Sequence, residues 1–195
     1  MVSKPVDRDV NHKFRITIHP ATIEDTKEIS TVLARSFYKF QGLNSLVYPL
    51  LQFTIREDLR YRLRSHSPLY CCLVAKVHQQ PNSASDSEDI VVATAEIALR
   101  SNSFWSSDHT FPYISNLAVD RDYRRLGIGS QLLSKCEQTA LEWGYHETRL
   151  HVLDSNYSAK QLYYNYGYQI SKAEANWGIW FDYSPRLLLK KSIQT

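Results

Sequence analysis

The chain has 195 residues, of which 43% are hydrophobic and 22% are charged, a composition typical of a soluble globular domain with a core of ordinary size. A net charge of +3 is too small to predict nucleic-acid binding, and no apolar run approaches the ~20 residues of a membrane helix. Three cysteines form no disulfide framework and residues 1–13 carry no secretory signal, so we expect a cytoplasmic protein.

The N-terminal half is predicted to contain a strand, two helices and two further strands, behind a flexible arm at residues 1–13. Residues 14–18 alternate between apolar and polar side chains, which is typical of a half-buried strand. Thr22 and Asp25 have the spacing of a capping box, so we expect a helix to begin there and to reach about Phe37. The other expected elements of this half are a helix at about 46–64 and strands at 69–78 and 90–99, joined by a mobile loop at 79–89.

The middle of the chain is predicted to form a strand, a polar turn and an amphipathic helix. Residues 113–119 have the apolar pattern of a strand, and residues 120–123 form the polar turn that follows it. Gly144 is placed to end the helix. Four apolar residues at four-residue steps predict its buried face: Ile128, Leu132, Cys136 and Ala140.

Arg124, Gly127 and Gly129 form an R-x-x-G-x-G pattern between that strand and that helix. The first N–H groups of a helix are unpaired and carry partial positive charge, so a turn without side-chain bulk can wrap a diphosphate there. Leu132 stands where a dinucleotide fingerprint needs a third glycine, and the Gly-Lys-Ser/Thr triplet of a nucleoside-triphosphate loop is missing. The pattern therefore indicates another nucleotide-type cofactor, with a ligand-free turn as the alternative.

A second motif follows a predicted strand at residues 148–153. It reads N-x-x-A-x-x-L-Y-x-x-x-G-Y, with the residues Asn156, Ala159, Leu162, Tyr163, Gly167 and Tyr168. Together with the glycine pattern, it resembles the two hallmarks of the GCN5-related N-acetyltransferase (GNAT) superfamily in their usual order. The motifs are most similar to those of N-terminal protein acetyltransferases of the ribosomal-protein alanine type.

The resemblance implies a single GNAT domain at residues 14–192, an α/β fold with a mixed, mostly antiparallel sheet of about six or seven strands and about four helices. It also implies transfer of acetyl from acetyl-CoA directly to a primary amine, foremost the α-amine of a protein or peptide. Two alternatives stay open: a small-molecule amine or polyamine acetyltransferase, which should show carboxylates in its acceptor cleft, and a non-catalytic acyl-CoA-binding sensor. Homodimers are common in the superfamily, whereas neither nucleic acid nor a membrane is an expected partner.

The resemblance assigns the cofactor site to three segments. The strand would offer main-chain groups to the pantetheine arm, the glycine turn would clasp the diphosphate, and the last helix would contact the pantetheine. Arg124 is expected to bind phosphate or to pin the turn, and Asn156 to contact pantetheine or to cap its helix. The expected cofactor-binding residues are Leu117, Ala118, Val119, Arg124, Arg125, Leu126, Gly127, Ile128, Gly129, Ser130, Asn156, Ala159 and Tyr163.

Amine acetylation needs a base near the amine and an acid near the sulfur of CoA. The resemblance places the acid at Tyr163, whose phenol with a reference pKa of ~10 is protonated at neutral pH, and packing among neighbouring tyrosines is the alternative. His151, with a reference pKa of ~6.5, is the expected base, and Tyr113 is expected to pair with it. Glu96 is the alternative base, because a carboxylate in mid-strand must face water, a partner or the site.

Three less regular regions are expected to shape the acceptor side. The aromatic-rich residues 176–183 lie between two final strands within 169–192, and residues 40–48 form the loop between the first two helices. Both are expected to grip the acceptor, with cover for the core as the alternative for the aromatic residues, and residues 101–110 could lie over the substrate mouth. An α-amine has a reference pKa of ~7.7–8.0 against ~10.4 for lysine, so a mild base such as His151 favours an N-terminal amine.

Overall fold

The computed structural model describes residues 14–37, 48–79, 89–101, 110–174 and 185–194. Several predictions fall wholly or mostly outside the described residues: the flexible arm at 1–13, the loop at 40–48, the mobile loop at 79–89, the segment at 101–110 and the aromatic-rich stretch at 176–183. None of the described helices is long and apolar enough to cross a membrane.

A seven-stranded sheet forms the centre of the described fold, in the order β1-β2-β3-β4-β5-β7-β6. Every neighbouring pair is antiparallel except β4 and β5, which are parallel. This mixed sheet confirms the predicted fold class. The strands are β1 (Phe14–Pro20), β2 (Tyr70–Gln79), β3 (Asp89–Ser101), β4 (Thr110–Val119), β5 (Glu147–Leu153), β6 (Gln169–Glu174) and β7 (Arg186–Ser192).

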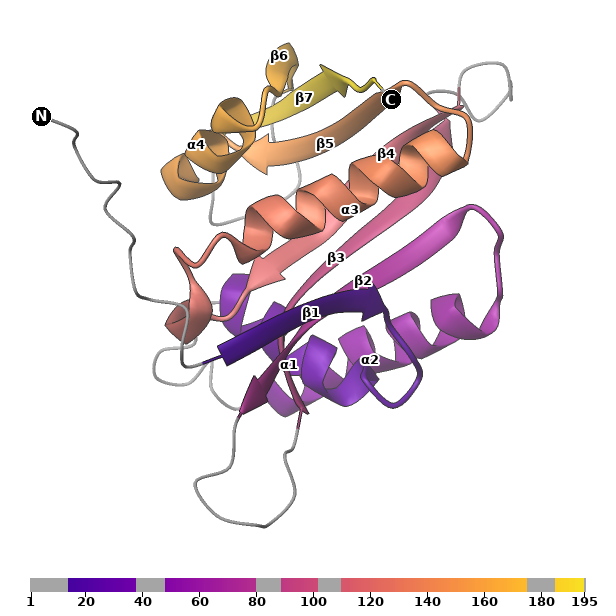
Figure 1. The fold of residues 1–195 in the computed structure, drawn as a ribbon, viewed down its shortest axis with the longest axis vertical. Coiled ribbons are helices and arrows are strands. Elements are labelled where there is room, and N and C mark those ends of the chain that lie inside the picture. Colours follow the sequence, from indigo (N-terminus) through magenta and orange to yellow (C-terminus); the bar gives the residue numbers. More distant parts are fainter. Residues whose placement is uncertain (1–13, 38–47, 80–88, 102–109, 175–184, 195) are drawn as a thin grey trace, which may run out of the picture.

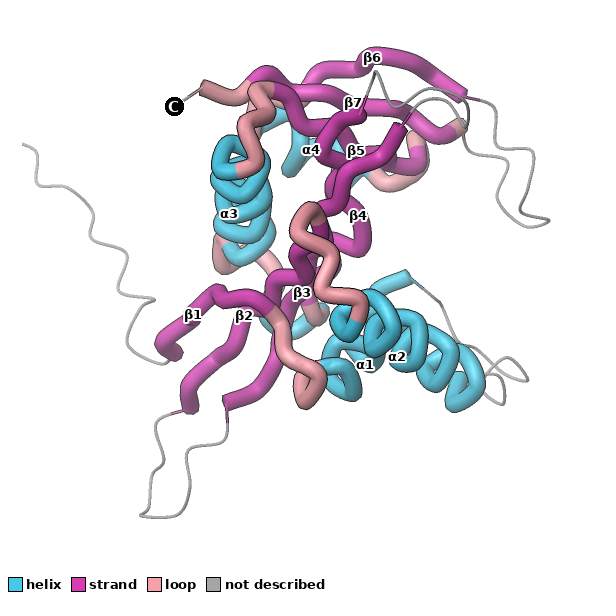
Figure 2. The backbone as a smooth tube through the Cα atoms, turned by 90° about the vertical axis from the view of Figure 1, so that its right-hand side faces the viewer, coloured by secondary structure: helices cyan, strands magenta, loops and turns pink. Residues whose placement is uncertain are grey.

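The helices lie on both faces of the sheet (Figure 1). Figure 2 shows α3 on one side of β3 and β4, with α1 and α2 on the other side. The α3 face holds a core cluster that includes Ile97, Leu132 and Leu150, and the α1–α2 face holds a second cluster that includes Ile29 and Leu59. The helices are α1 (Thr26–Phe37), α2 (Tyr48–Arg64), the short 3-10 helix η2 (Arg121–Tyr123), α3 (Ile128–Glu142) and α4 (Tyr157–Asn165).

The parallel contact between β4 and β5 is short. It consists of two residue pairs, Tyr113 with Arg149 and Ile114 with Leu150. Beyond them, residues 115–119 of β4 keep β3 as a neighbour on one side but pair with no described strand on the other. An unpaired strand edge exposes N–H and C=O groups that a ligand can bind. We call residues 115–119 the unpaired edge of β4.

The start of α1 differs from the prediction. The helix begins at Thr26. The Asp25 carboxylate accepts a hydrogen bond from the N–H of Thr22 at 2.8 Å, which is the bond that this side chain makes in a capping box, and another from the Thr22 hydroxyl at 3.0 Å. Asp25 also pairs with Lys76 of β2 at 2.6 Å. The Thr22–Asp25 spacing therefore marks a turn tied to the sheet, just ahead of the helix.

Candidate active site

The turn between β4 and α3 has the backbone geometry of an anion-binding loop. Arg125 and Gly127 have φ angles of +68° and +77°, and Gly127 caps α3 in a left-handed conformation that glycine adopts without strain. The first backbone bond recorded for this helix runs from the N–H of Gln131 to the carbonyl of Gly127 at 3.1 Å. The N–H groups ahead of it make no backbone bond to a described residue, as expected for a helix start.

Close packing around position 129 favours glycine there. A Cβ atom at this position would lie 3.1 Å from a methyl group of Leu162 and 3.9 Å from methyl groups of Leu117 and Val119. The start of α3, the helix α4 and the unpaired edge of β4 therefore meet at Gly129. The second glycine of the R-x-x-G-x-G pattern lets these three elements approach one another.

Two of the expected cofactor-binding residues have the structural roles named as alternatives. The Arg124 Nε–H donates to the carbonyl of Val119 at 3.0 Å, which pins the turn to the end of β4, although the residue as a whole is exposed. The Asn156 side chain accepts from the N–H of Ala159 at 3.2 Å and so caps α4. Contact of either side chain with the cofactor stays a prediction.

Tyr113 and His151 are brought together across the β4–β5 pair. The Tyr113 hydroxyl lies 2.8 Å from His151 Nδ1, although the two residues are 38 positions apart in the chain. His151 Nε2 lies 3.4 Å from a carboxylate oxygen of Glu174 on β6, an electrostatic contact longer than an ordinary hydrogen bond. The expected pair is present, and Glu174, which no sequence pattern indicated, faces its other nitrogen.

The surroundings favour the neutral form of His151. Burial lowers its pKa below the usual 6.5, and the positive charges of Arg186 and Arg100 act in the same direction. The Glu174 carboxylate opposes them in part. The Arg100 guanidinium also stacks on the Tyr113 ring, 3.8 Å from its centroid. A neutral imidazole can accept a proton, so the electrostatics fit the predicted role.

Tyr163 is the buried residue of α4, with 7% of its surface exposed. Burial raises its pKa to about 12, so the phenol keeps its proton across the physiological range. No hydrogen bond between described residues engages its hydroxyl, which leaves the proton available to a ligand. Its neighbour Tyr164 is 41% exposed, and the Tyr166 ring carries the Lys191 ammonium 4.2 Å from its centroid. Among the three tyrosines, Tyr163 is thus the one held inside the fold.

Glu96, the alternative base, is enclosed by donors. It is 1% exposed, and its carboxylate accepts from Tyr70 at 2.9 Å, from Asn116 at 2.7 Å and from the Arg62 guanidinium of α2. Three donors engage the two oxygens and the side chain is closed to solvent, which disfavours direct contact with an acceptor amine. Asn116, which sequence reasoning missed, has a φ of +52° where β4 carries one extra residue against β3.

The Glu96 cluster yields a stability prediction. Glu96→Ala is expected to lower the free energy of unfolding by about 3–5 kcal/mol, because the half-buried Arg62 would lose its main counter-charge. Glu57→Ala, which removes an exposed ion pair with Arg60, is the control and should cost at most ~1 kcal/mol. Urea denaturation measures both. Equal costs for the two variants would show that the buried cluster contributes no more than a surface pair.

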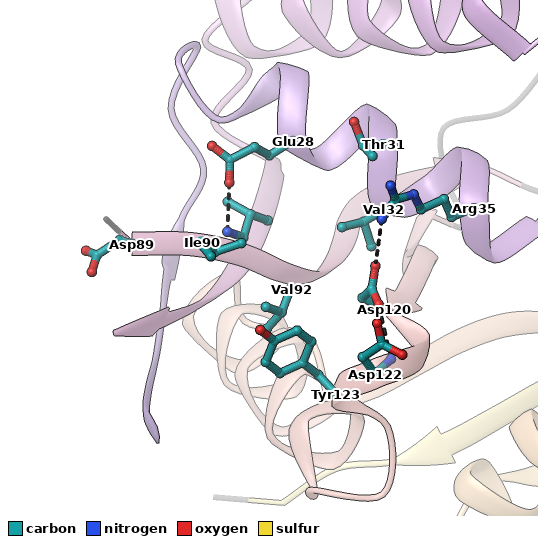
Figure 3. Close-up of a pocket in the computed structure, with 11 residues that line it drawn as sticks. Glu28, Thr31, Val32, Arg35, Asp89, Ile90, Val92, Asp120, Asp122 and Tyr123 are labelled. Atoms are coloured by element: carbon teal, nitrogen blue, oxygen red, sulfur yellow. Dashed lines mark hydrogen bonds and ion pairs between the residues drawn. The ribbon is translucent and has the colours of Figure 1, made fainter. Parts of the chain in front are cut away.

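A pocket of about 350 Å³ lies beside the turn, between α1, β3 and η2. Figure 3 shows carboxylates at its rim, where Glu28 accepts from the N–H of Val91 at 2.8 Å and Asp120 lies 3.8 Å from Arg35. Its lining includes none of the predicted catalytic residues. The six residue steps of β4 from Tyr113 to Val119 span roughly 20 Å, so these carboxylates lie well away from the Tyr113–His151 pair.

The cofactor turn yields a second prediction. Leu126→Glu is expected to weaken binding of CoA about ten-fold or more, because it places a carboxylate beside the amides that would clasp the diphosphate. Leu126 is 38% exposed, so the fold should be retained. Leu126→Gln has nearly the same shape without the charge and serves as the control in calorimetric titration with CoA. Equal affinities for the two variants would place the diphosphate elsewhere.

Two known acetyltransferases are similar in sequence to this chain. GCN5-related N-acetyltransferase 10, chloroplastic, from Arabidopsis thaliana is 26% identical over 86% of this chain and 68% of its own length. Thialysine N-epsilon-acetyltransferase from Bos taurus is 33% identical over 60% of this chain and 67% of its own.

A solved structure has the same fold. Ribosomal-protein-S18-alanine N-acetyltransferase from Escherichia coli superposes with a TM-score of 0.63 at 17% identity, covering 93% of this chain and 96% of that one. The acetyltransferase (GNAT) family profile matches residues 33–168, a span that includes the glycine turn, the Tyr113–His151 pair and Tyr163. The chain therefore belongs to the GNAT family of acetyltransferases, enzymes that use acetyl-CoA as cosubstrate.

Proposed function

We propose that the enzyme acetylates the α-amine of a protein or peptide N-terminus, through a domain that spans residues 14–192. The observation that carries the proposal is the 2.8 Å contact between Tyr113 and His151, beside two arginines that favour neutral imidazole. Acetyl-CoA supplies the thioester carbon to which the amine nitrogen bonds as the bond from carbon to sulfur breaks. The protein must bind the cosubstrate, accept one proton from the amine and give one to the sulfur.

Binding of the cosubstrate is assigned to backbone groups that pair with no other described residue. The N–H groups of residues 125–130 would hold the diphosphate at the start of α3, where the helix dipole also favours negative charge. The unpaired edge of β4 would pair with the amide groups of the pantetheine arm. Gly129 supports this arrangement because it packs α4, and with it Tyr163, against both segments.

Proton acceptance is assigned to His151 acting through Tyr113. Glu174 is ionised, with a pKa lowered mainly by Lys172, so the His151 nitrogen that faces it carries the ring hydrogen. The lone pair then lies on Nδ1, toward the Tyr113 hydroxyl. The amine would give its proton to the Tyr113 oxygen while the Tyr113 proton moves to Nδ1. His151 becomes imidazolium, stabilised by Glu174.

Proton donation is assigned to the Tyr163 hydroxyl. The CoA sulfur leaves as a thiolate, and it would take its proton from this phenol as the bond to carbon breaks. Solvent would restore the proton of Tyr163 and remove that of His151 after product release.

An N-terminal amine suits a base of this strength. An α-amine has a reference pKa of ~7.7–8.0, so part of it is already neutral at pH 7, whereas lysine at ~10.4 is almost wholly protonated. A histidine with a lowered pKa is a weak base, and it matches the more weakly basic amine. Among the described residues, Glu174 is the one carboxylate that contacts the Tyr113–His151 pair. A site for a polyamine should have more carboxylates, so this arrangement disfavours a polyamine as the acceptor.

A small-molecule amine is the second candidate acceptor. It is favoured by the 33% identity with a relative named for the ε-amine of thialysine. Membership of an acetyltransferase family disfavours the non-catalytic sensor.

The acceptor is tested by CoA release over a panel of N-terminal peptides, lysine peptides and free amines, with mass spectrometry of the acetylated site. We expect turnover of peptides at their α-amines. Strong turnover of polyamines with none of peptides would refute the preferred acceptor.

We also propose the cytoplasm as the working compartment, because all three cysteines are free and two of them are buried. The relative named chloroplastic makes a plastid the alternative, and a fluorescent fusion of the full chain distinguishes the two. Light scattering tests whether the enzyme forms a homodimer.

A further inference from the structure

Positively charged side chains surround the Tyr113–His151 pair on its own face of the sheet. Burial along β5 alternates, so Arg149 and His151 share the face opposite to the α3 core. Directly opposed residues of β5 and β7 lie on one face, which places Arg186 and Lys190 of β7 there, opposite Leu153 and Arg149. Arg100 of β3 reaches the same place and covers the Tyr113 ring.

The negative charges on this face are already paired. Glu147 binds Arg149 at 2.6 Å. Glu174 lies 3.3 Å from Lys172 and 3.4 Å from His151. Among the described residues, no carboxylate forms an ion pair with Arg100, Arg186 or Lys190. Glu174 stands directly opposite Arg186 in the register of β6 and β7, yet its carboxylate pairs with Lys172 and His151. Among the described residues, the positive charges of this face therefore outnumber its carboxylates next to the predicted base.

We propose that the acceptor carries a carboxylate close to its amine, held by Arg100 and Arg186 on either side of the Tyr113–His151 pair. This inference rests on the proposed function and narrows its substrate class. Arginine suits the role because its planar guanidinium binds carboxylates through two parallel hydrogen bonds. Arg100 lies 3.8 Å from the centroid of the Tyr113 ring, and Arg186 lies opposite Leu153, two residues after His151 on the same face of β5.

The carboxylate has two chemical sources. It belongs either to an acidic side chain at the second position of a peptide, or to the free carboxylate of a small amino acid with a second amine. A polyamine has no such group and would be repelled by the same arginines. The positive charge on this face should therefore favour both kinds of acceptor over polyamines.

The test compares kcat/KM between matched acceptors. One arm uses N-terminal peptides that differ only in Asp, Asn or Lys at the second position, and the other uses diamino acids and their carboxamides. We expect the Asp peptide to exceed the Asn peptide about ten-fold, or each diamino acid to exceed its carboxamide by a similar factor. Whichever arm shows the effect identifies the source.

Variants assign the preference to the two arginines. Arg100→Gln and Arg186→Gln should each bring the ratio of kcat/KM between the charged acceptor and its neutral counterpart towards one. Arg186→Glu should make the Lys peptide a better acceptor than the Asp peptide. Arg15→Gln, at an exposed arginine of β1 at the far edge of the sheet, is the matched control and should keep the wild-type ratio.

Two results overturn the inference: equal rates for charged and neutral acceptors in both arms, or a ratio that survives both glutamine variants. Either one, combined with clear acetylation of peptides at their α-amines, leaves the proposed function intact. CoA binding without acetylation of any amine would instead refute the proposed function itself.

Discussion

His151→Gln is expected to lower kcat/KM by about 10²- to 10⁴-fold, the usual contribution of a general base. The amide of glutamine can still bond to the Tyr113 hydroxyl, so the fold and the affinity for CoA should be retained. What it loses is the ability to hold the proton of the amine. Steady-state CoA release with the preferred peptide measures the change.

The pH dependence of activity is an independent test of His151 as the base. Only neutral His151 accepts a proton, and its pKa lies below 6.5 because of burial and the two arginines. The loss of activity caused by protonation of His151 should therefore begin only below pH 6.5. It adds to the decline caused by protonation of the acceptor amine, whose reference pKa is ~7.7–8.0, and His151→Gln should keep the decline of the amine but lack the loss below pH 6.5. His146→Gln, at an exposed histidine ahead of β5, is the control. Wild-type rates in His151→Gln would rule out the residue as the base.

Tyr163→Phe is expected to lower kcat about 10²- to 10⁴-fold while leaving the KM for acetyl-CoA within a few-fold of the wild type. The phenol is protonated from pH 6 to 9, since burial raises its pKa to about 12, so the loss should be uniform over that range. The phenylalanine ring can keep the edge-on packing against Tyr168, whose ring centroid lies 6.0 Å from that of Tyr163, so the fold should be unaffected.

Tyr164→Phe is the matched control for that substitution. It removes the same hydroxyl from the neighbouring position of α4, where the side chain is 41% exposed, and it should leave kcat unchanged. If both variants turn over at the wild-type rate, another group protonates the CoA sulfur. If both are equally slow, the effect belongs to the helix and not to Tyr163.

Local patterns predicted the elements well because they reflect local physics. The apolar steps from Ile128 to Ala140 correspond to the buried face of α3, and Gly144 ends the helix region with a φ of +83°. The R-x-x-G-x-G pattern likewise marked the left-handed Gly127. Thr22 and Asp25 do form the expected bond, but the turn that they close lies ahead of α1, which begins at Thr26.

Contacts between distant elements were beyond such patterns. The Tyr113–His151 pair was expected only through the family resemblance, since it depends on β4 and β5 lying side by side. Arg62 could not be matched with Glu96, because that contact depends on how α2 lies across the sheet. No sequence pattern marks Asn116, because its positive φ depends on the extra residue of β4, which the structure alone reveals.

We propose that backbone N–H groups at the start of α3 hold the diphosphate of acetyl-CoA. Hydrogen–deuterium exchange of the full chain, with and without acetyl-CoA, tests it at the level of single amides. We predict strong slowing of exchange at residues 125–130 when the cosubstrate binds, together with slowing along the unpaired edge of β4. Unchanged exchange at residues 125–130, with protection elsewhere in the chain, would show that the diphosphate binds at another site.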